Sequence, residues 1–363
     1  MLTYEHSLIF VCCVLCAAIL SVRKDVIMSF WRKRVKQLVL AGLVVTIGAF
    51  LGGCGQQGST TSDSKMKVVT TVYPAYDLAK QVGGDKVDVT MLVPAGSEPH
   101  DWEPTAQNLK EIGKAKVFIY NGAGLEPTEK ILQSDILKKA QPLELAKNIN
   151  LLKIADEEHE HEHDQATTPS GEATDKASQN KQAGKEEHHH GEYDPHIWLD
   201  PENVMKETDA VVKAFSEADP ANKAYYEANG KAYKEKLAAL DKDYKDFAAT
   251  VTDKNLIVSH EAFGYLAKRY GFTQVGIMGI APDAEPTPER MSEIVSFVKQ
   301  NHVKAIFSEE LVNPKLADAI AKETGVQVAV LSPVESLSEE QMKNGDNYLT
   351  IMRKNLETLK KYL

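Results

Sequence analysis

Two stretches of the chain resemble each other: residues 73–89 read YPAYDLAKQVGGDKVDV, and residues 263–277 read FGYLAKRYGFTQVGI. Each combines a segment of helical spacing, glycine after it, and a short β-branched run. A second pair follows the first, EPTAQNLKEIGKAKVFIYN at 103–121 and EPTPERMSEIVSFVKQNHVKAIFSE at 285–309. The shared Leu-Ala-Lys and Glu-Pro-Thr triplets lie about 180–190 residues apart. The sequence therefore predicts two lobes of similar helix-and-strand architecture.

Strand-like and helix-like segments alternate within each lobe. In the first lobe the predicted strands are 67–72, 87–93 and 117–120, and the predicted helices are 76–82, 105–114 and 128–140. In the second lobe LIVSH at 256–260 matches the opening strand. This alternation predicts an α/β fold in which each lobe has a parallel sheet with helices on both faces. The crevice between two such lobes is a common place for a ligand site.

A long charged stretch separates the lobes. After a predicted helix at 202–217, residues 220–250 contain no internal proline and carry a rough apolar stripe of alanines and leucines. We expect one helix of about eight turns there, which would join the lobes as a rigid spine. The predicted organisation is an N-terminal lobe at 67–200, helices at 201–250 and a C-terminal lobe at 251–363.

The N-terminal region has the pattern of a secretory signal. Residues 28–54 read MSFWRKRVKQLVLAGLVVTIGAFLGGC, a basic segment, an uncharged apolar segment and small residues before Cys54. This ending resembles the lipobox of bacterial lipoproteins, which implies cleavage after residue 53, lipidation of Cys54 and a flexible tether at 54–66. The alternative is an uncut membrane anchor. Residues 1–27 precede a second methionine, Met28, and we hypothesise that translation starts there rather than at Met1.

Composition and net charge limit the number of domains and the classes of protein to which the chain can belong. The chain has 363 residues, 43% hydrophobic and 26% charged, which fits two globular domains. Its net charge of −10 argues against a nucleic-acid binder. Removal of residues 1–53 takes away six basic and two acidic side chains, so the remainder carries −14. Cys54 is the one cysteine left, and it is the predicted lipid site. We therefore expect neither a disulfide nor a cysteine metal ligand in the mature protein.

Residues 156–192 form a polar, aperiodic insert without aliphatic side chains beyond alanine. We expect this segment to be disordered. Its histidines offer several weak metal sites that would collect a metal ion and pass it to the crevice or sense its level, or it is a loop with incidental metal affinity. Deleting 157–191 and measuring growth at a limiting supply of that metal separates the two. HEHEH at 159–163 matches the His-Glu-x-x-His protease pattern, but that motif needs an ordered helix. The six histidines are His159, His161, His163, His188, His189 and His190.

Three other histidines occupy similar positions in the predicted fold. His100 in SEPHDWEPT, His196 in DPHIWLDP and His260 in LIVSH each lie where a loop or strand meets a following helix. Histidines at such junctions of both lobes can converge at the crevice, whereas His302 occupies no such place. For a single histidine the ordinary interpretation is a surface or hydrogen-bonded residue. Three in equivalent positions favour a metal site.

Four motifs together carry a specific resemblance. PAGSEPHDWEPT, DPHIWLDP, VSHEAFGYLAKRYG, and LSPVESL with the later GDNYLTIMRKNL resemble the cluster A-I metal-binding subunits of bacterial ABC importers, often labelled adhesin lipoproteins. The likeness covers residues 66–363 and includes the histidine-rich insert. It implies a monomeric receptor on the outer face of the cytoplasmic membrane, anchored through Cys54. Its implied partners are zinc and the importer's permease with its cytoplasmic ATPase.

The resemblance also implies a ligand set. The three imidazole ligands fall on His100, His196 and His260, and a carboxylate from the second lobe falls on Glu335. Glu309 and Glu310, or water, are the alternatives for the fourth position. Four further residues are expected to line the site or support its ligands, or else to pack as ordinary loop residues: Asp101, Trp102, Trp198 and Asp200.

Three imidazoles and one carboxylate suit tetrahedral Zn²⁺, whereas Mn²⁺ prefers more oxygen ligands. Zinc is therefore the predicted metal, and manganese is the alternative. A zinc site with an open position could activate water in a hydrolase, but a fourth protein ligand closes it. We expect no catalytic residues, and we find no phosphate-binding or nucleophile-elbow motif. An additional adhesin activity has no positive support in the sequence.

Overall fold

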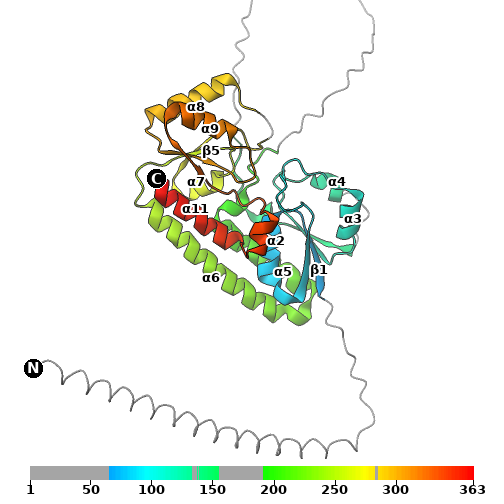
Figure 1. The fold of residues 1–363 in the computed structure, drawn as a ribbon. Helices are drawn as coiled ribbons and strands as arrows, with labels where there is room; N and C mark the ends of the chain where they lie inside the picture. Colours follow the sequence, from blue (N-terminus) through cyan, green and yellow to red (C-terminus); the bar gives the residue numbers. More distant parts are fainter. Residues whose placement is uncertain (1–64, 133–136, 138, 155–190, 283–284) are drawn as a thin grey trace, which may run out of the picture. The chain divides into compact units, whose positions relative to one another are not determined.

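The computed structural model describes residues 65–132, 137, 139–154, 191–282 and 285–363 (Figure 1). The signal segment, Cys54 and the six histidines of the insert lie outside these residues. Among the described helices, none is both long and apolar enough to cross a membrane.

The N-terminal lobe contains one parallel sheet in the order β2-β1-β3-β4. Val68 and Val69, successive residues of the first strand, face opposite sides of this sheet and join different hydrophobic clusters. The strands are β1 (Met66–Thr70), β2 (Val87–Met91), β3 (Val117–Tyr120) and β4 (Gln141–Glu144), and the helices are α2 (Tyr73–Gly83), α3 (Ala106–Ile112) and α4 (Thr128–Leu132).

The C-terminal lobe repeats this arrangement, with the sheet order β6-β5-β7-β8 and every pairing parallel. Its strands are β5 (Asn255–Val258), β6 (Thr273–Gly276), β7 (Ala305–Ser308) and β8 (Gln327–Val330), and its helices are α7 (Gly264–Tyr270), α8 (Pro288–Gln300), α9 (Lys315–Thr324), α10 (Glu339–Lys343) and α11 (Tyr348–Tyr362). The same strand order in both lobes confirms the similarity that the repeated motifs predict.

Two helices lie between the lobes in the sequence, α5 (Pro201–Ala218) and α6 (Lys223–Ala248). Asp200 caps α5, because its carboxylate accepts a hydrogen bond from the Glu202 N–H. The 3₁₀ turn η5 (Pro220–Asn222) precedes α6. Helix α6 has 26 residues and packs against α2 and α5 and also against α7 and α11 of the C-terminal lobe (Figure 1). This is the expected long helix joining the lobes.

One hydrophobic core extends across both lobes. It combines inner-face residues of both sheets, such as Val68 and Val258, with α5, α6 and α11 residues such as Phe215, Tyr244 and Leu356. The outer faces of the sheets pack on separate clusters, with α3 and α4 on one lobe and α8 and α9 on the other. The lobes are therefore joined by continuous packing as well as by the chain.

Two expectations about helices were wrong in detail. The predicted helix at 128–140 is α4, which ends at Leu132; Leu137 and Lys139 lie in a 3₁₀ turn before β4. The predicted helix at 105–114 is confirmed as α3, but it starts at Ala106, six residues after His100 and not directly after it; the Thr105 hydroxyl caps it by accepting from the Asn108 N–H. Pro104 disfavours helical geometry in the residue before it, so the helix cannot begin at His100.

The ends of the insert meet at a short antiparallel contact. The Ile154 N–H donates to the Glu192 carbonyl at 3.1 Å, and Lys153 bridges to Tyr193. Nearby, a Cβ on Gly124 would come within 2.9 Å of the Gly191 Cα, and Gly124 has φ of +83°. Both features favour glycine at this position.

Candidate metal centre

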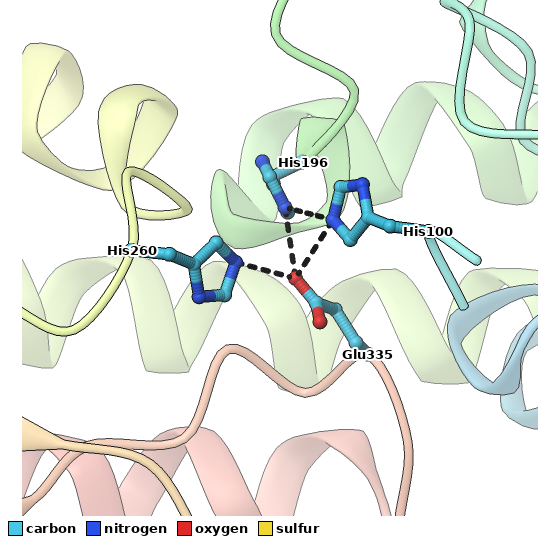
Figure 2. A group of neighbouring side chains, drawn as sticks. All are labelled: His100, His196, His260 and Glu335. Atoms are coloured by element: carbon cyan, nitrogen blue, oxygen red, sulfur yellow. Dashed lines mark hydrogen bonds and ion pairs between the residues drawn. The ribbon is translucent and has the colours of Figure 1, made fainter. Parts of the chain in front are cut away.

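Four side chains that could bind a metal converge between the lobes. One ligand atom from each of His100, His196, His260 and Glu335 lies within 4.8 Å of the corresponding atoms of the others (Figure 2). His196 and His260 are fully buried, and Glu335 is 5% exposed. Among the residues that the structure describes, this is the one group with such geometry.

The topology explains why these residues meet. His100 lies in the loop after β2, His260 comes two residues after β5, and Glu335 lies in the loop after β8. The carboxyl ends of parallel strands lie at one edge of a sheet, and both sheets turn this edge to the crevice. His196 arrives differently, in the segment that follows the insert, as the residue before the 3₁₀ turn η4 (Ile197–Leu199).

The spacing of the ligand atoms fits a tetrahedral ion. The Glu335 Oε1 lies 2.8 Å from Nε2 of His196, 3.1 Å from Nε2 of His260 and 3.7 Å from Nε2 of His100. Nε2 of His100 lies 3.2 Å from Nε2 of His196. A tetrahedron with zinc–ligand bonds of about 2.0–2.1 Å has ligand separations of roughly 3.3 Å. Small shifts of these side chains would therefore enclose Zn²⁺.

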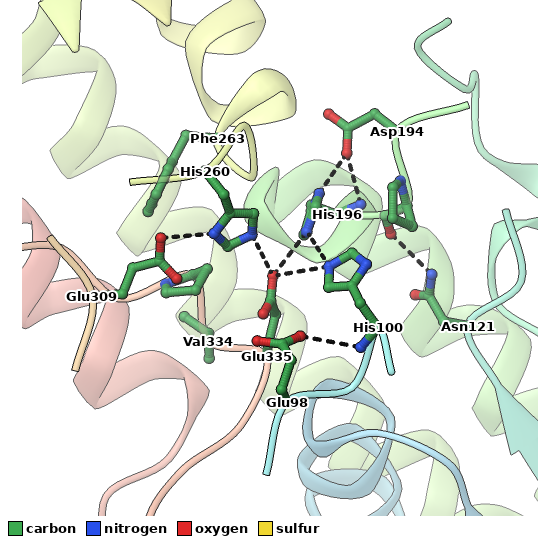
Figure 3. Close-up of polar contacts among 12 residues, drawn as sticks. Glu98, His100, Asn121, Asp194, His196, His260, Phe263, Glu309, Val334 and Glu335 are labelled. Carbon is green, nitrogen blue, oxygen red and sulfur yellow. Dashed lines mark hydrogen bonds and ion pairs between the residues drawn. The ribbon is translucent and has the colours of Figure 1, made fainter. Parts of the chain in front are cut away.

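Carboxylates orient two of the three imidazoles through their other nitrogen (Figure 3). Nδ1 of His196 lies 2.7 Å from Oδ1 of Asp194, and Nδ1 of His260 lies 2.7 Å from Oε1 of Glu309. A proton on Nδ1 leaves the lone pair of Nε2 free for a metal, and the carboxylate makes that nitrogen a stronger donor. Asp194 is itself fixed from the second lobe, because the Tyr265 hydroxyl donates to its carbonyl at 3.0 Å.

Contacts between imidazoles and carboxylates shift the pKa values of the residues in the centre. Burial lowers the pKa of His196, but Asp194 and Glu335 outweigh it and raise this pKa to about 9. Burial alone would raise the pKa of Glu335, whereas His260 and the other two imidazoles hold it well below its usual range. Burial is the main cause that lowers the pKa of His100. The centre therefore stabilises a carboxylate anion, which can bind a cation.

The loop that carries Glu335 has an unusual backbone. Val334 has φ of +59°, although a β-branched side chain strongly disfavours this region. The Ser332 hydroxyl accepts from the Val334 N–H at 3.2 Å. Asn355 in α11 holds Ser332 on both sides, since its Oδ1 accepts from the Ser332 N–H and its Nδ2 donates to the Ser332 carbonyl. Surrounding contacts thus stabilise a strained turn next to a candidate ligand.

A cavity of about 430 Å³ lies beside the centre. Glu98, Leu311 and Val312 line this cavity and also a smaller one that Glu335 lines. The Glu98 carboxylate accepts from the His100 N–H at 3.1 Å, and burial together with Glu335 raises the pKa of Glu98 to about 7. The two cavities therefore share part of their lining, and the smaller one reaches Glu335.

The structure brings together the four residues of the predicted ligand set, whereas the carboxylates of Glu309 and Glu310 have other partners. Glu309 contacts the far side of the His260 ring, and the exposed Glu310 contacts Gln341. His302 lies in an exposed turn after α8.

The four residues expected around the site have different roles. Trp198 is buried beside His196, and Asp200 caps α5. Asp101 is exposed, and Trp102 packs half-buried on the N-terminal lobe. Sequence reasoning missed Asp194, because its place two residues before a candidate ligand does not show that its carboxylate faces Nδ1 of the His196 ring.

Comparisons with known proteins agree with this geometry. The family model described as "Zinc-uptake complex component A periplasmic" matches residues 68–362. The chain belongs to this family. The expected resemblance to metal-binding subunits is thereby confirmed, and the family's description places such components outside the cytoplasm.

Two curated relatives illustrate the similarity. The zinc-binding lipoprotein AdcA of Streptococcus pneumoniae serotype 4 (strain ATCC BAA-334 / TIGR4) is 38% identical over 325 residues, which are 89% of this chain and 60% of that protein. The high-affinity zinc uptake system protein ZnuA of Bacillus subtilis (strain 168) is 38% identical over 327 residues, 88% of this chain and 96% of that protein. The chain thus spans about three fifths of the length of the streptococcal relative.

Solved structures confirm the two-lobed α/β fold. The Zn(II)-bound ZnuA-like domain of Streptococcus pneumoniae AdcA matches with a TM-score of 0.66 at 35% identity, covering 82% of this chain and 98% of that one. The laminin-binding protein Lmb of Streptococcus agalactiae, described as having adhesin and metal-transporting activity, matches with a TM-score of 0.67 at 34% identity, covering 82% and 99%.

Proposed function

We propose that this chain is an extracytoplasmic receptor that binds Zn²⁺ and delivers it to the permease of an ABC importer. The observation that carries the proposal is the convergence of His100, His196, His260 and Glu335 from both lobes. The family match and the zinc-binding names of the relatives support the same function. In this proposal the metal is cargo, and ATP hydrolysis occurs in a separate cytoplasmic subunit.

Zinc rather than manganese is the proposed cargo because of the donor set. Three neutral imidazoles and one carboxylate match the preferred ligands of Zn²⁺, whereas Mn²⁺ favours more oxygen donors. Glu335 is the proposed fourth ligand, since Glu309 is already engaged with His260. With Glu335 in place no coordination position stays open for activated water, which favours a receptor over a hydrolase.

The structure also supports a way of loading. Zinc would pass the cavity lined by Glu98, reach the imidazoles, and be enclosed by Glu335. Because one hydrophobic core spans both lobes, we propose loop ordering and slight tilting on binding instead of wide closure. The anchor at Cys54 and a monomeric state complete the proposal.

Metal analysis tests the proposal directly. A soluble form lacking residues 1–54 and 157–191 should retain one tightly bound zinc per chain. His100→Ala and His260→Ala should each lose it. The control is His302→Ala, which removes an exposed histidine outside the centre and should retain the zinc. No zinc in the parent protein, or zinc retained by both ligand variants, would refute the proposal.

The ligand set also predicts a pH dependence. A histidine must be neutral to bind zinc, so protons compete with the metal as the pH falls. We expect zinc affinity to decrease steadily from pH 7.5 to pH 5.5, measured by competition with a chelator whose own pH dependence is known. An affinity that stays constant over this range would contradict three imidazole ligands.

A further inference from the structure

We propose that Trp198 is a positioning residue that fixes the Glu335 carboxylate relative to His196 across the crevice. This inference rests on the proposed zinc function and goes beyond it, because Trp198 is not among the proposed ligands. Its basis is a set of contacts between the segment that carries His196 and the loop that carries Glu335.

Trp198 contacts both sides of the centre. Its ring packs edge-on against the His196 imidazole, with centroids 5.5 Å apart and an angle of 69°. Its indole N–H donates to the Pro333 carbonyl at 2.7 Å, two residues before Glu335. Trp198 is 1% exposed, so water cannot replace this hydrogen bond. One side chain thus links a ligand of the N-terminal segment to the loop of a C-terminal ligand.

Trp198 is itself held from the second lobe. The hydroxyl of Tyr348, near the start of α11, donates to the Trp198 carbonyl at 2.7 Å. Tyr348 is 2% exposed. The indole therefore has a fixed position from which to hold Pro333.

The Glu335 loop requires such support because its backbone is strained. Pro333 precedes Val334, whose φ of +59° is unfavourable for a β-branched residue. Asn355 fixes the loop at Ser332, and Trp198 fixes it at Pro333. On the other side of Glu335, the Ser336 hydroxyl accepts from the Gly96 N–H at 2.9 Å. Without the indole N–H, the turn can relax and the carboxylate can move away from the imidazoles.

The chain contains a natural comparison. Trp102 follows His100 by two residues, as Trp198 follows His196. Within the described residues the Trp102 indole N–H makes no hydrogen bond, and its ring packs half-buried on the N-terminal lobe. The two tryptophans share their spacing from a histidine and differ in the link to the Glu335 loop.

The experiment is a double-mutant cycle on zinc affinity, measured by chelator competition on the soluble form. Trp198→Phe keeps an aromatic ring but removes the donor, and it should weaken zinc binding about tenfold, in the range found for groups that orient ligands. Trp102→Phe should change the affinity less than twofold. In a Glu335→Gln background, Trp198→Phe should have an effect below twofold, because the carboxylate it positions is gone.

A spectroscopic readout separates positioning from loss of packing. The visible spectrum of the Co²⁺-loaded protein reports the geometry around the ion, and Trp198→Phe should shift it toward the spectrum of Glu335→Gln. Thermal melting of the metal-free proteins shows that each variant is folded. If Trp198→Phe does not fold, Tyr348→Phe removes only a hydroxyl from the same link and should change affinity and spectrum in the same direction.

The outcomes are distinct. An unchanged affinity for Trp198→Phe, or an equal loss with and without Glu335, would overturn this inference and leave the zinc receptor intact. Absence of zinc from the unsubstituted protein would overturn the proposed function, and this inference with it.

Discussion

At the residue scale, two neighbouring glutamates show how one carboxylate can orient a ligand while the next does not. Glu309 lies 2.7 Å from Nδ1 of His260 and is 6% exposed, whereas Glu310 is exposed and contacts Gln341. The two residues have the same chemistry and adjacent positions after β7. Their difference in role therefore comes from the direction in which each side chain points.

Glu309→Gln should lower zinc affinity by about 10–100-fold, because the His260 ring loses the carboxylate that holds its tautomer and strengthens Nε2. Glu310→Gln is the matched control and should leave the affinity within a factor of two. Isothermal titration with a competing chelator measures both. Equal losses in the two variants would show that the effect is one of general negative charge.

The candidate ligands themselves could be predicted from the sequence, and their supporting groups could not. His100, His196 and His260 stand at junctions that a parallel fold brings together, and Glu335 followed from the family resemblance. The partners of Nδ1 depend on which carboxylate oxygen faces which ring. The local backbone at Asp194 and at the end of β7 decides which carboxylate faces which ring. The spacing of residues in the sequence does not contain this information.

At the element scale, α5 contains a buried acid that costs the fold stability. Glu207 is 3% exposed, and its Oε1 has no hydrogen-bond partner within the described part of the chain. Burial, with a smaller contribution from Asp200, raises the pKa of Glu207 from 4.5 to about 8. The folded state therefore binds more protons than the unfolded state between these values. Stability falls as the pH rises through this window.

Glu207→Gln should remove this pH dependence. At pH 8.5 we expect the variant to be more stable than the parent by of the order of 1–3 kcal/mol, with little difference near pH 4.5. Urea unfolding at several pH values measures the change. Glu217→Gln, on the exposed face of the same helix, is the control and should not alter the pH profile. A parallel pH profile for parent and Glu207→Gln would contradict the assignment.

The elements differed in how well they could be predicted. Strands such as β1 and β3 are short β-branched or apolar runs, and α6 is a long stretch without proline, so local pattern identifies them. The strand β4 contains Pro142 and only one apolar aliphatic residue, Leu143, so its pattern is weak. It forms because β3 offers a parallel partner along its whole length. The pairing that creates this strand is a property of the sheet, which explains why no strand was predicted at 141–144.

At the scale of the whole molecule, a buried charge network joins the lobes in addition to the shared core. The Arg269 Nε, on α7, lies 2.6 Å from Asp241 of α6 and 3.1 Å from Asp200 at the start of α5. The side chains of Arg269 and Asp241 are 11% and 10% exposed. Loss of the guanidinium would leave the two poorly solvated carboxylates close together, with Lys245 as the one cation still paired with Asp241 among the ion pairs of the described residues.

Arg269→Met should therefore destabilise the protein by roughly 3 kcal/mol, as expected when one partner of a buried pair is removed. Arg353→Met breaks an ion pair with Asp243 whose side chains are 50% and 46% exposed, and it should cost less than about 0.5 kcal/mol. Urea denaturation midpoints with unchanged slopes measure both. Similar costs for the two variants would mean that the Arg269 network does not hold the lobes together.

The contact between Ile154 and Glu192 bears on how this molecule can vary. These residues are hydrogen-bonded at 3.1 Å, so the chain between them closes a loop whose ends the fold already fixes. The entropy of closing a loop grows only with the logarithm of its length, about 0.6 kcal/mol for each doubling. A change in the length of the segment between these two residues should therefore have a small effect on the free energy of folding. The hydrogen bond at its ends sets the place where the chain returns to the lobe, four residues before His196, and this place does not depend on that length.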